Sequence, residues 1–117
     1  MRDVKPIFDA IDSQNADDFV AHLTEDVTFR FGNAEPVHGR AAVAEAVNGF
    51  WGTIGGLTHH VLNTWDVADT TICQIDVEYK RLDGNTVVTP NADILVFDGD
   101  LVKNWQIYID VAPVYAP

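Results

Sequence analysis

Apolar residues near the start of the chain recur at the spacing of helices. Behind Asp3 they fall at positions 4, 7, 8 and 11, one face of a short helix that begins at a capping residue. A second short helix is predicted at Asp17 and Asp18, because acidic residues stabilise the positive end of a helix. From Arg40 the run AAVAEAVNGFW again has helical spacing, and Gly55-Gly56 ends it. The sequence therefore predicts three N-terminal helices.

Strand-like alternation dominates the rest of the chain. Val27, Phe29 and Phe31 alternate with polar residues and predict one short strand, and residues 32–39 are predicted to form a loop. Residues 57–111 are rich in Val, Ile, Thr and aromatics and carry turn-forming pairs at hairpin spacing. They predict four long antiparallel strands, at residues 57–67, 71–81, 86–97 and 101–111. Pro90 inside the third predicts a bulge or a bend, because proline has no N–H for the ladder.

Helices first and a meander of strands afterwards predict an α+β fold. We expect the three helices to pack on one face of a strongly curved, mainly antiparallel sheet, which leaves a pocket between the two layers. The sequence contains no repeat, no low-complexity run and no linker. A single domain over residues 1–117 is expected.

Composition and charge narrow the classes of partner. Of the 117 residues, 47% are hydrophobic and 21% charged, as in one compact soluble domain. The net charge of -11 disfavours nucleic acids and anionic membranes as partners. The start has no signal-peptide pattern, and no apolar run approaches the ~20 residues of a membrane span. A cytoplasmic protein is expected.

Ligands for a metal or a cofactor are scarce in the sequence. Cys73 is the single cysteine, which excludes an intrachain disulfide and a cysteine zinc cluster and favours a reducing compartment. The four histidines lack the H-x-H and H-x-x-x-H spacings of metal sites. The glycines form no phosphate-binding loop at the start of a helix. We therefore expect no metal and no cofactor.

Three sequence segments resemble a known family. They are TEDVTF, EPVHGR ahead of the third helix, and NWQIYID in the last strand. Together with the order of elements, they make the whole chain resemble the SnoaL-like members of the nuclear transport factor 2-like superfamily. The resemblance implies a cone-shaped fold that encloses a pocket. It does not imply one activity, because the superfamily includes polyketide cyclases, ketosteroid isomerase, limonene-epoxide hydrolase, dehydratases and non-catalytic binding domains.

The resemblance supplies three candidate catalytic carboxylates, those of Asp110, Asp76 and Asp93. Limonene-epoxide hydrolase has an aspartate five residues after a tryptophan, as in Trp105 and Asp110, and its Arg-x-Asp strand resembles Gln74-Ile75-Asp76. That likeness implies that Asp110 takes a proton from water while Asp76 protonates the leaving oxygen. SnoaL-like cyclases instead imply that Asp110 removes a carbon-bound proton. Asp93 resembles the second aspartate of ketosteroid isomerase, which donates a hydrogen bond to an oxyanion.

The direction in which the strand at 71–81 faces stays open at this stage. Amphipathic alternation puts its apolar residues inside and leaves Gln74, Asp76 and Glu78 in water. Alternatively, the apolar face packs on a second copy while the polar face lines the cup. Homodimers through the outer face of the sheet are common in the superfamily, and the resemblance implies one here.

The neighbouring histidines, His59 and His60, must point to opposite faces of one strand. His60 together with Asn63 echoes a pattern in SnoaL-like sequences, so His60 is the candidate for contact with a ligand. A purely structural role is the alternative for either histidine.

An aromatic wall with a few polar groups suits a flat, hydrophobic, oxygenated small molecule. The candidate substrate-binding residues are Phe29, Phe31, Trp51, His60, Gln74, Asn91, Trp105 and Tyr108. We expect cofactor-free acid/base catalysis, polyketide cyclase-like or epoxide hydrolase-like, by Asp110 with Asp76 or Asp93. The alternative is a non-catalytic ligand-binding or dimerisation module.

Overall fold

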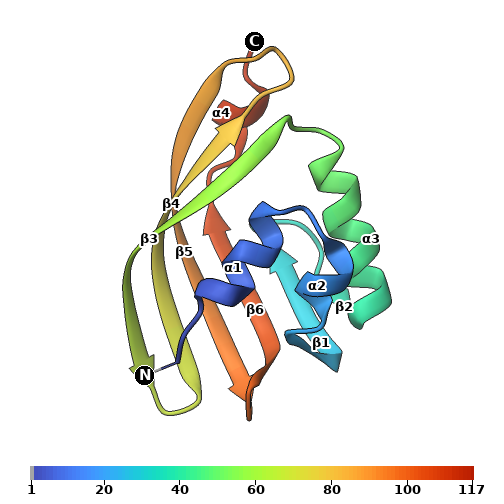
Figure 1. Ribbon diagram of the computed structural model, residues 1–117, viewed down its shortest axis with the longest axis vertical. Coiled ribbons are helices and arrows are strands. Elements are labelled where there is room, and N and C mark those ends of the chain that lie inside the picture. The colour runs from blue at the N-terminus through green and yellow to red at the C-terminus, as the bar shows by residue number, and fades with distance from the viewer. Residues whose placement is uncertain (1) are drawn as a thin grey trace.

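Three helices lie against one face of a six-stranded sheet, which is the predicted α+β fold (Figure 1). The computed structural model describes residues 2–117. The helices are α1 (Lys5–Asp12), α2 (Ala16–Val20), α3 (Arg40–Trp51) and a short α4 (Ala112–Tyr115). The strands are β1 (Leu23–Phe31), β2 (Val37–His38), β3 (Gly56–Val67), β4 (Thr70–Lys80), β5 (Thr86–Asp98) and β6 (Leu101–Ile109). Within residues 2–117 no helix is both long and apolar enough to cross a membrane.

The sheet has the strand order β2-β1-β6-β5-β4-β3. Strands β3 to β6 form the predicted antiparallel meander, and β1 pairs in parallel with β6. Two elements differ from the sequence prediction. The segment expected to be a loop contains β2, which pairs with Thr28 and Phe29 of β1. The last strand ends at Ile109 rather than at Val111, because Val111 is the N-cap of α4, which has Pro113 in its first turn.

Of the bulge or bend predicted at Pro90, the bulge is wrong. The register between β4 and β5 runs without a shift through the pair of Asp76 and Pro90. Pairing of β5 with β6 begins at Asn91, so Pro90 lies where β5 has one neighbour only, and a missing N–H is tolerated at such a position. The sheet is irregular elsewhere, between Val61 and Asn63 of β3 and between Val96 and Phe97 of β5.

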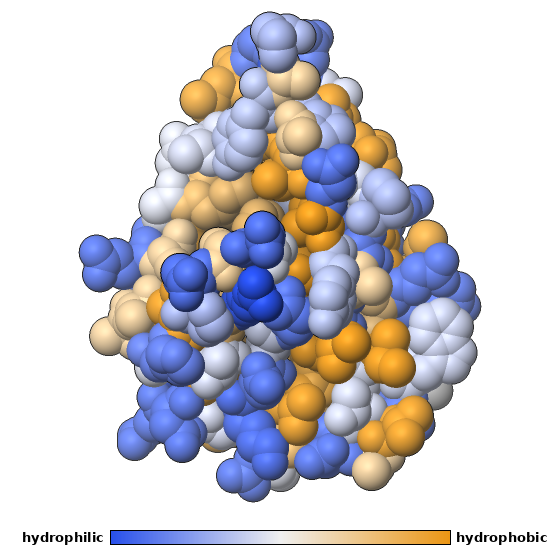
Figure 2. All heavy atoms as spheres, turned by 180° about the vertical axis from the view of Figure 1, so that it is seen from behind, coloured by the Kyte–Doolittle hydropathy of each residue, from blue (hydrophilic) through white to orange (hydrophobic). Residues whose placement is uncertain are grey.

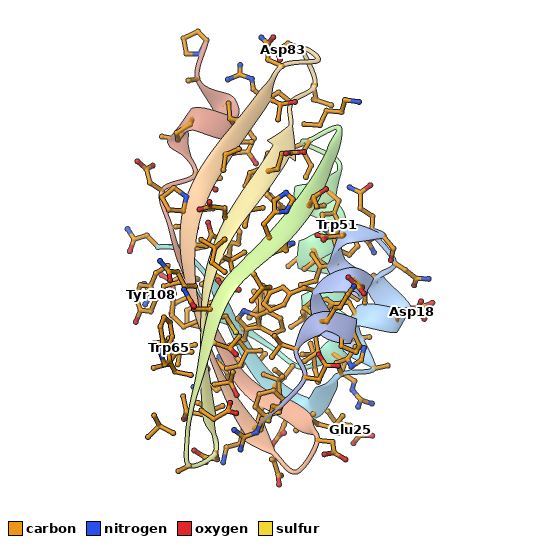
Figure 3. All side chains as sticks on the ribbon, turned by 60° about the vertical axis from the view of Figure 1, so that its left-hand side comes forward. Asp18, Glu25, Trp51, Trp65, Asp83 and Tyr108 are labelled. Carbon is orange, nitrogen blue, oxygen red and sulfur yellow. The ribbon has the colours of Figure 1, made fainter. Side chains whose placement is uncertain are left out.

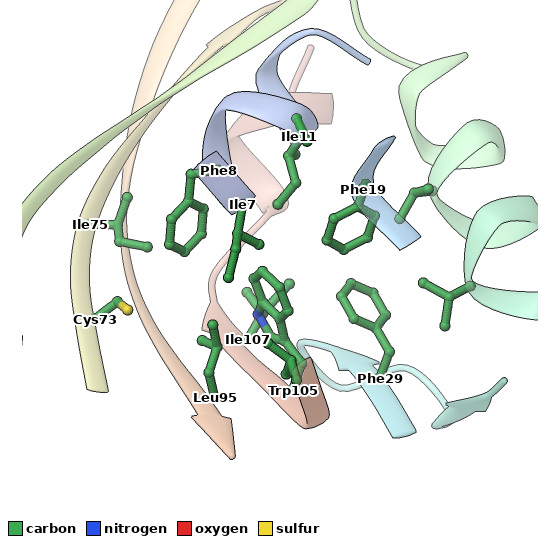
Figure 4. Packing of buried hydrophobic residues seen from close by; sticks show 14 of the residues in the cluster. Ile7, Phe8, Ile11, Phe19, Phe29, Cys73, Ile75, Leu95, Trp105 and Ile107 are labelled. Atoms are coloured by element: carbon green, nitrogen blue, oxygen red, sulfur yellow. The ribbon is translucent and has the colours of Figure 1, made fainter. Parts of the chain in front are cut away.

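The core between helices and sheet is centred on the fully buried side chain of Trp105 (Figure 4). Phe8 of α1, Phe19 of α2 and Phe29 of β1 meet its ring edge to face, with centroids 5.5 to 5.9 Å away. Such aromatic contacts add to the stabilisation that burial of their large apolar area provides. The last long strand thus holds both short helices and the first strand in place.

The junction between β1 and α3 explains the sequence His38-Gly39-Arg40. The Nδ1 atom of His38 lies 3.1 Å from the hydroxyl of Thr28, its pairing partner on β1. Gly39 has φ +86°, a backbone conformation that favours glycine, and its N–H donates to the Val27 carbonyl. The Arg40 guanidinium donates twice to the Leu23 carbonyl, at 2.8 and 2.5 Å. These contacts fix the start of α3 beside β1, and α3 then forms one wall of the cavity described below.

The exterior mixes apolar and charged side chains, and apolar residues form a broken band on the side seen from behind (Figure 2). The large hydrophobic side chains that are more than a third exposed are Val61, Leu62, Trp65, Val67, Leu82, Val88, Tyr108 and Tyr115. Among them, Trp65 and Tyr108 lie on the face of the sheet that points away from the helices (Figure 3).

Candidate functional site

A cavity of about 240 Å³ lies between the helices and the inner face of the sheet. Aromatic and aliphatic side chains dominate its wall, and its polar groups come from Glu35, His59, Tyr79, Asn91 and Asp93. The remaining lining residues are Ile11, Phe19, Phe29, Phe31, Ala34, Val37, Ala46, Val47, Phe50, Trp51, Leu57, Trp105 and Ile107. Since Ala34, Glu35 and Ala46 are exposed whereas Asn91 and Asp93 are buried, the cavity runs inward from the β1–β2 loop and α3.

Asp93 is the buried carboxyl group of this cavity, with 1% of the residue exposed. Alternation along β5 directs it inward, between Asn91 and Leu95, which share its face. Its Oδ2 accepts a hydrogen bond from the Trp105 indole N–H at 3.1 Å. Its Oδ1 is buried and has no hydrogen-bond partner among residues 2–117.

Loss of hydration raises the pKa of Asp93 to about 7, although His59 and the Trp105 hydrogen bond act in the opposite direction. A carboxyl group with a pKa near neutrality is present in both its acidic and its basic form at cellular pH. It can therefore donate a proton or accept one, as general acid/base catalysis requires.

His59 is the second titratable group on the cavity wall. Its side chain is 8% exposed, and its Nδ1 lies 2.5 Å from Asp12 Oδ1. The other oxygen of that carboxylate accepts the backbone N–H of His59 at 2.8 Å. The ring also packs on Phe8, with centroids 5.0 Å apart. The last residue of α1 thus holds this histidine by two bonds.

Asn91 and Tyr79 complete the polar wall. The buried Thr89 hydroxyl donates to Asn91 Oδ1 at 3.2 Å, which leaves the amide N–H groups to donate to a ligand. Burial, with Asp93 nearby, raises the pKa of the Tyr79 phenol well above its usual value. Tyr79 is therefore a neutral hydrogen-bond donor at every physiological pH.

Cys73 pairs with Asp93 across β4 and β5 but is not suited to nucleophilic chemistry. Burial raises the pKa of its thiol to about 12. The reactive form of cysteine is the thiolate, which is scarce at such a pKa. Among residues 2–117 no group of three or more His, Cys, Asp or Glu side chains is arranged to hold a metal ion.

Six of the residues selected from the sequence line the cavity. They are Phe29, Phe31, Trp51, Asn91, Asp93 and Trp105. The structure thus brings together one candidate carboxylate and most of the aromatic wall.

Asp110 lies outside the cavity, contrary to the expectation that it shares a site with Asp76 or Asp93. It is exposed, it follows the end of β6, and its carboxylate accepts the Ala112 N–H at 3.0 Å at the start of α4. Alternation from the inward-facing Trp105 and Ile107 directs position 110 to the opposite face of the sheet. Its position is that of a residue that stabilises the turn into α4.

The outer face of the sheet carries the remaining four residues selected from the sequence, so the expectation that they line the cavity is wrong. Cys73, Ile75, Val77 and Tyr79 of β4 are buried in the core, so the alternate residues point away from it. Of the two arrangements left open by the sequence, β4 therefore has the first, with its apolar side chains in the core and its polar side chains outside. The four residues are Asp76, Gln74, His60, which pairs with Asp76, and Tyr108, which is 57% exposed.

His59, Asp12 and Tyr79 belong to the site but were not selected from the sequence. The missed signal was the pairing of β3 with β4, which aligns His59 with the inward-facing Val77. Leu57 two residues earlier is buried, and period-two alternation from it puts His59 inside and His60 outside.

Comparison with known proteins shows the family of this chain. A model of the SnoaL-like domain matches residues 4–105. The chain belongs to the SnoaL-like domain family. No curated protein matches the SnoaL-like chain in sequence.

Solved structures share the fold of this SnoaL-like domain at low sequence identity. A ketosteroid isomerase-like protein from Catenulispora acidiphila, crystallised with trimethylamine, has a TM-score of 0.89 and 15% identity, covering 97% of this chain and 88% of its own. TerC, co-crystallised with polyporic acid, has a TM-score of 0.85 and 12% identity, covering 96% and 92%. A Jannaschia protein assigned as a SnoaL-like polyketide cyclase has a TM-score of 0.83 and 16% identity, covering 97% and 90%. These matches establish the nuclear transport factor 2-like fold.

Proposed function

We propose that the cavity binds a neutral, flat, hydrophobic molecule with a carbonyl or hydroxyl oxygen, and that Asp93 exchanges a proton with that oxygen. The observation that carries this proposal is the buried, unpartnered Oδ1 of Asp93 in an otherwise apolar cavity. A buried polar atom without a partner costs about 1–3 kcal/mol, so a ligand oxygen that bonds to it removes this penalty. Polyketide cyclase-like chemistry on a carbonyl compound is the corresponding reaction class.

The Trp105 hydrogen bond supports a catalytic role for Asp93 rather than a merely structural one. It occupies Oδ2, so Oδ1 is the oxygen that is left for a ligand. Charge that develops on a ligand oxygen is stabilised most by donors that are already in place before the reaction. A protonated Asp93, with the Asn91 amide and the Tyr79 phenol on the same wall, supplies such donors.

The size and charge of the cavity limit the ligand class. Its volume of about 240 Å³ is below the roughly 300–1,000 Å³ of typical small-molecule pockets, so it suits molecules of one or two rings. The net charge of -11 and Glu35 at the exposed end of the cavity disfavour anionic ligands. Two relatives of the same fold were crystallised with small molecules, trimethylamine and polyporic acid, which supports a small-molecule ligand here.

Titration with the bicyclic ketone 2-tetralone tests the proposal. We expect saturable shifts of the Trp105 indole signal in NMR spectra, because this group lies on the cavity wall and donates to Asp93. An Asp93→Asn variant keeps the shape of the side chain and should bind the ketone while losing catalysis of α-proton exchange. Binding without exchange by the unmodified protein would favour the non-catalytic module, and absence of binding would contradict the proposed ligand class.

We also propose that the outer face of the sheet pairs with a second copy of the chain. Trp65, Val88 and Tyr108 are each at least 50% exposed there, with Ile72 and Ile94 between them on the same face. Exposed apolar side chains gathered on one sheet face suit the two-fold symmetric interface of a homodimer.

A further inference from the structure

We propose that His59, oriented by Asp12, is the second proton-transfer group of the cavity and removes the α-proton of a ketone whose oxygen is bound by Asp93. This inference rests on the proposed function. It assigns the substrate class more narrowly, to ketones with an acidic C–H next to the carbonyl.

The two bonds to Asp12 distinguish His59 from a histidine that merely joins two elements. A bond from the backbone N–H to Oδ2 would be enough to attach β3 to the end of α1. The second bond, between Nδ1 and Oδ1, fixes the orientation of the ring itself. With the Nδ1 proton held by the carboxylate, the lone pair lies on Nε2, which makes no hydrogen bond within residues 2–117.

The surroundings of His59 suit a general base. Phe8 covers one side of the ring, and the residue lines the same cavity as Asp93. A charge on Asp12 stabilises the imidazolium that forms when Nε2 accepts a proton, and the effect is large where water is excluded.

His59 also borders a shallow groove on the outside of the molecule. That groove lies between α1 and β3, and Lys5, Asp9 and Thr64 are among its lining residues. One face of the histidine thus adjoins the cavity, and another adjoins a surface that is open to solvent. A proton removed from a bound ligand can leave by this route without crossing the apolar interior.

The proposed step is a reversible enolisation in which atoms and electrons balance. Nε2 of His59 takes the α-proton, and the electrons of that C–H bond form the carbon–carbon double bond. The carbonyl π electrons take the Asp93 proton, which gives an enol and an Asp93 carboxylate. Reversal returns a proton to the carbon, and neither an oxidant nor a cofactor is consumed.

Deuterium incorporation into 2-tetralone in D₂O, followed by proton NMR, measures this step directly. We expect exchange by the unmodified protein to exceed that of buffer, and His59→Gln to lower it by about 10²-fold or more. His60→Gln is the matched control, because His60 lies next in sequence but on the outer face. It should leave the exchange rate unchanged. Binding measured at the Trp105 indole confirms that each variant retains its cavity.

Asp12→Asn tests the positioning role by comparing exchange with binding. Without the carboxylate, the His59 ring is no longer held in one orientation, so the maximum exchange rate should fall about tenfold while the affinity for 2-tetralone stays unchanged. A merely structural contact would lower stability but leave the exchange rate of the ketone-bound protein unchanged.

The outcomes separate this inference from the proposal on which it rests. Exchange that is lost in Asp93→Asn but unchanged in His59→Gln would overturn the role of His59 and retain that of Asp93. Binding without any exchange would overturn both catalytic roles. If 2-tetralone does not bind, both the ligand class and this inference fall together.

Discussion

At the scale of single residues, the burial of Asp93 makes the stability of the fold depend on pH. Its pKa is about 7 in the folded protein and about 3.9 in an unfolded chain, so the folded state binds the extra proton between these values. The free energy of unfolding therefore falls as the pH rises from about 4 to 7. The total change is on the order of a few kcal/mol.

We predict that Asp93→Asn removes this dependence. Urea denaturation at pH 5 and pH 8 should show a lower midpoint at pH 8 for the unmodified protein and a smaller difference for the variant. Asp110→Asn is the control, because that carboxylate is exposed and should leave the difference unchanged. Equal pH dependence in all three proteins would show that Asp93 is ionised in the folded state.

At the scale of elements, the attachment of α3 to β1 decides whether the cavity keeps its wall. Arg40 at the start of α3 satisfies the Leu23 carbonyl at a point where β1 is out of register with β6. We predict that Arg40→Ala lowers the free energy of unfolding by about 1–3 kcal/mol, because that carbonyl loses its partner. Urea denaturation measures this loss.

Arg30→Ala provides the matched comparison for Arg40. Arg30 also donates to a carbonyl, that of Ala34, but the bond is exposed to solvent. Its removal should change stability by no more than about 0.5 kcal/mol. Equal losses in the two variants would contradict a special role for the α3 junction.

The elements also show how far the sequence could be interpreted. The long strands β3 to β6 alternate over nine or more residues, so their existence and pairing could be predicted. The two-residue strand β2 and the four-residue α4 are too short to produce a periodic signal. The bulge predicted at Pro90 is absent for a different reason. Pro90 is tolerated in a regular strand because β5 pairs with β6 only from the next residue onward, and the sequence around the proline does not show where that pairing begins.

The candidate site was predictable where burial follows local alternation and not where it depends on a neighbouring strand. Asp93 and Asn91 follow alternation within β5, and both were selected. His59 and His60 are adjacent, so what distinguishes them is the burial of Leu57, two residues before His59, together with the register with β4. Asp110 was misplaced for a different reason, because its assignment came from the family resemblance, whereas alternation from the inward-facing Trp105 five residues earlier directs it to the opposite face.

At the scale of the whole molecule, the proposed homodimer makes a direct prediction. Trp65→Asp puts a charge on the outer face of the sheet, on the edge strand β3, and should convert a dimer into a monomer in size-exclusion chromatography with light scattering. Leu82→Asp is the control, because Leu82 is 72% exposed in the turn between β4 and β5, away from that face. A monomeric unmodified protein would refute the dimer.

The parallel pairing of β1 with β6 has a consequence for how the protein is made on the ribosome. Register pairs such as Phe29 with Trp105 join a strand near the start of synthesis to the last long strand. Trp105 is also the side chain around which Phe8 and Phe19 pack. The N-terminal third therefore leaves the ribosome without its packing partner and must wait for nearly the entire chain. A nascent chain that stops before β6 should remain sensitive to protease and should be a natural target for chaperones.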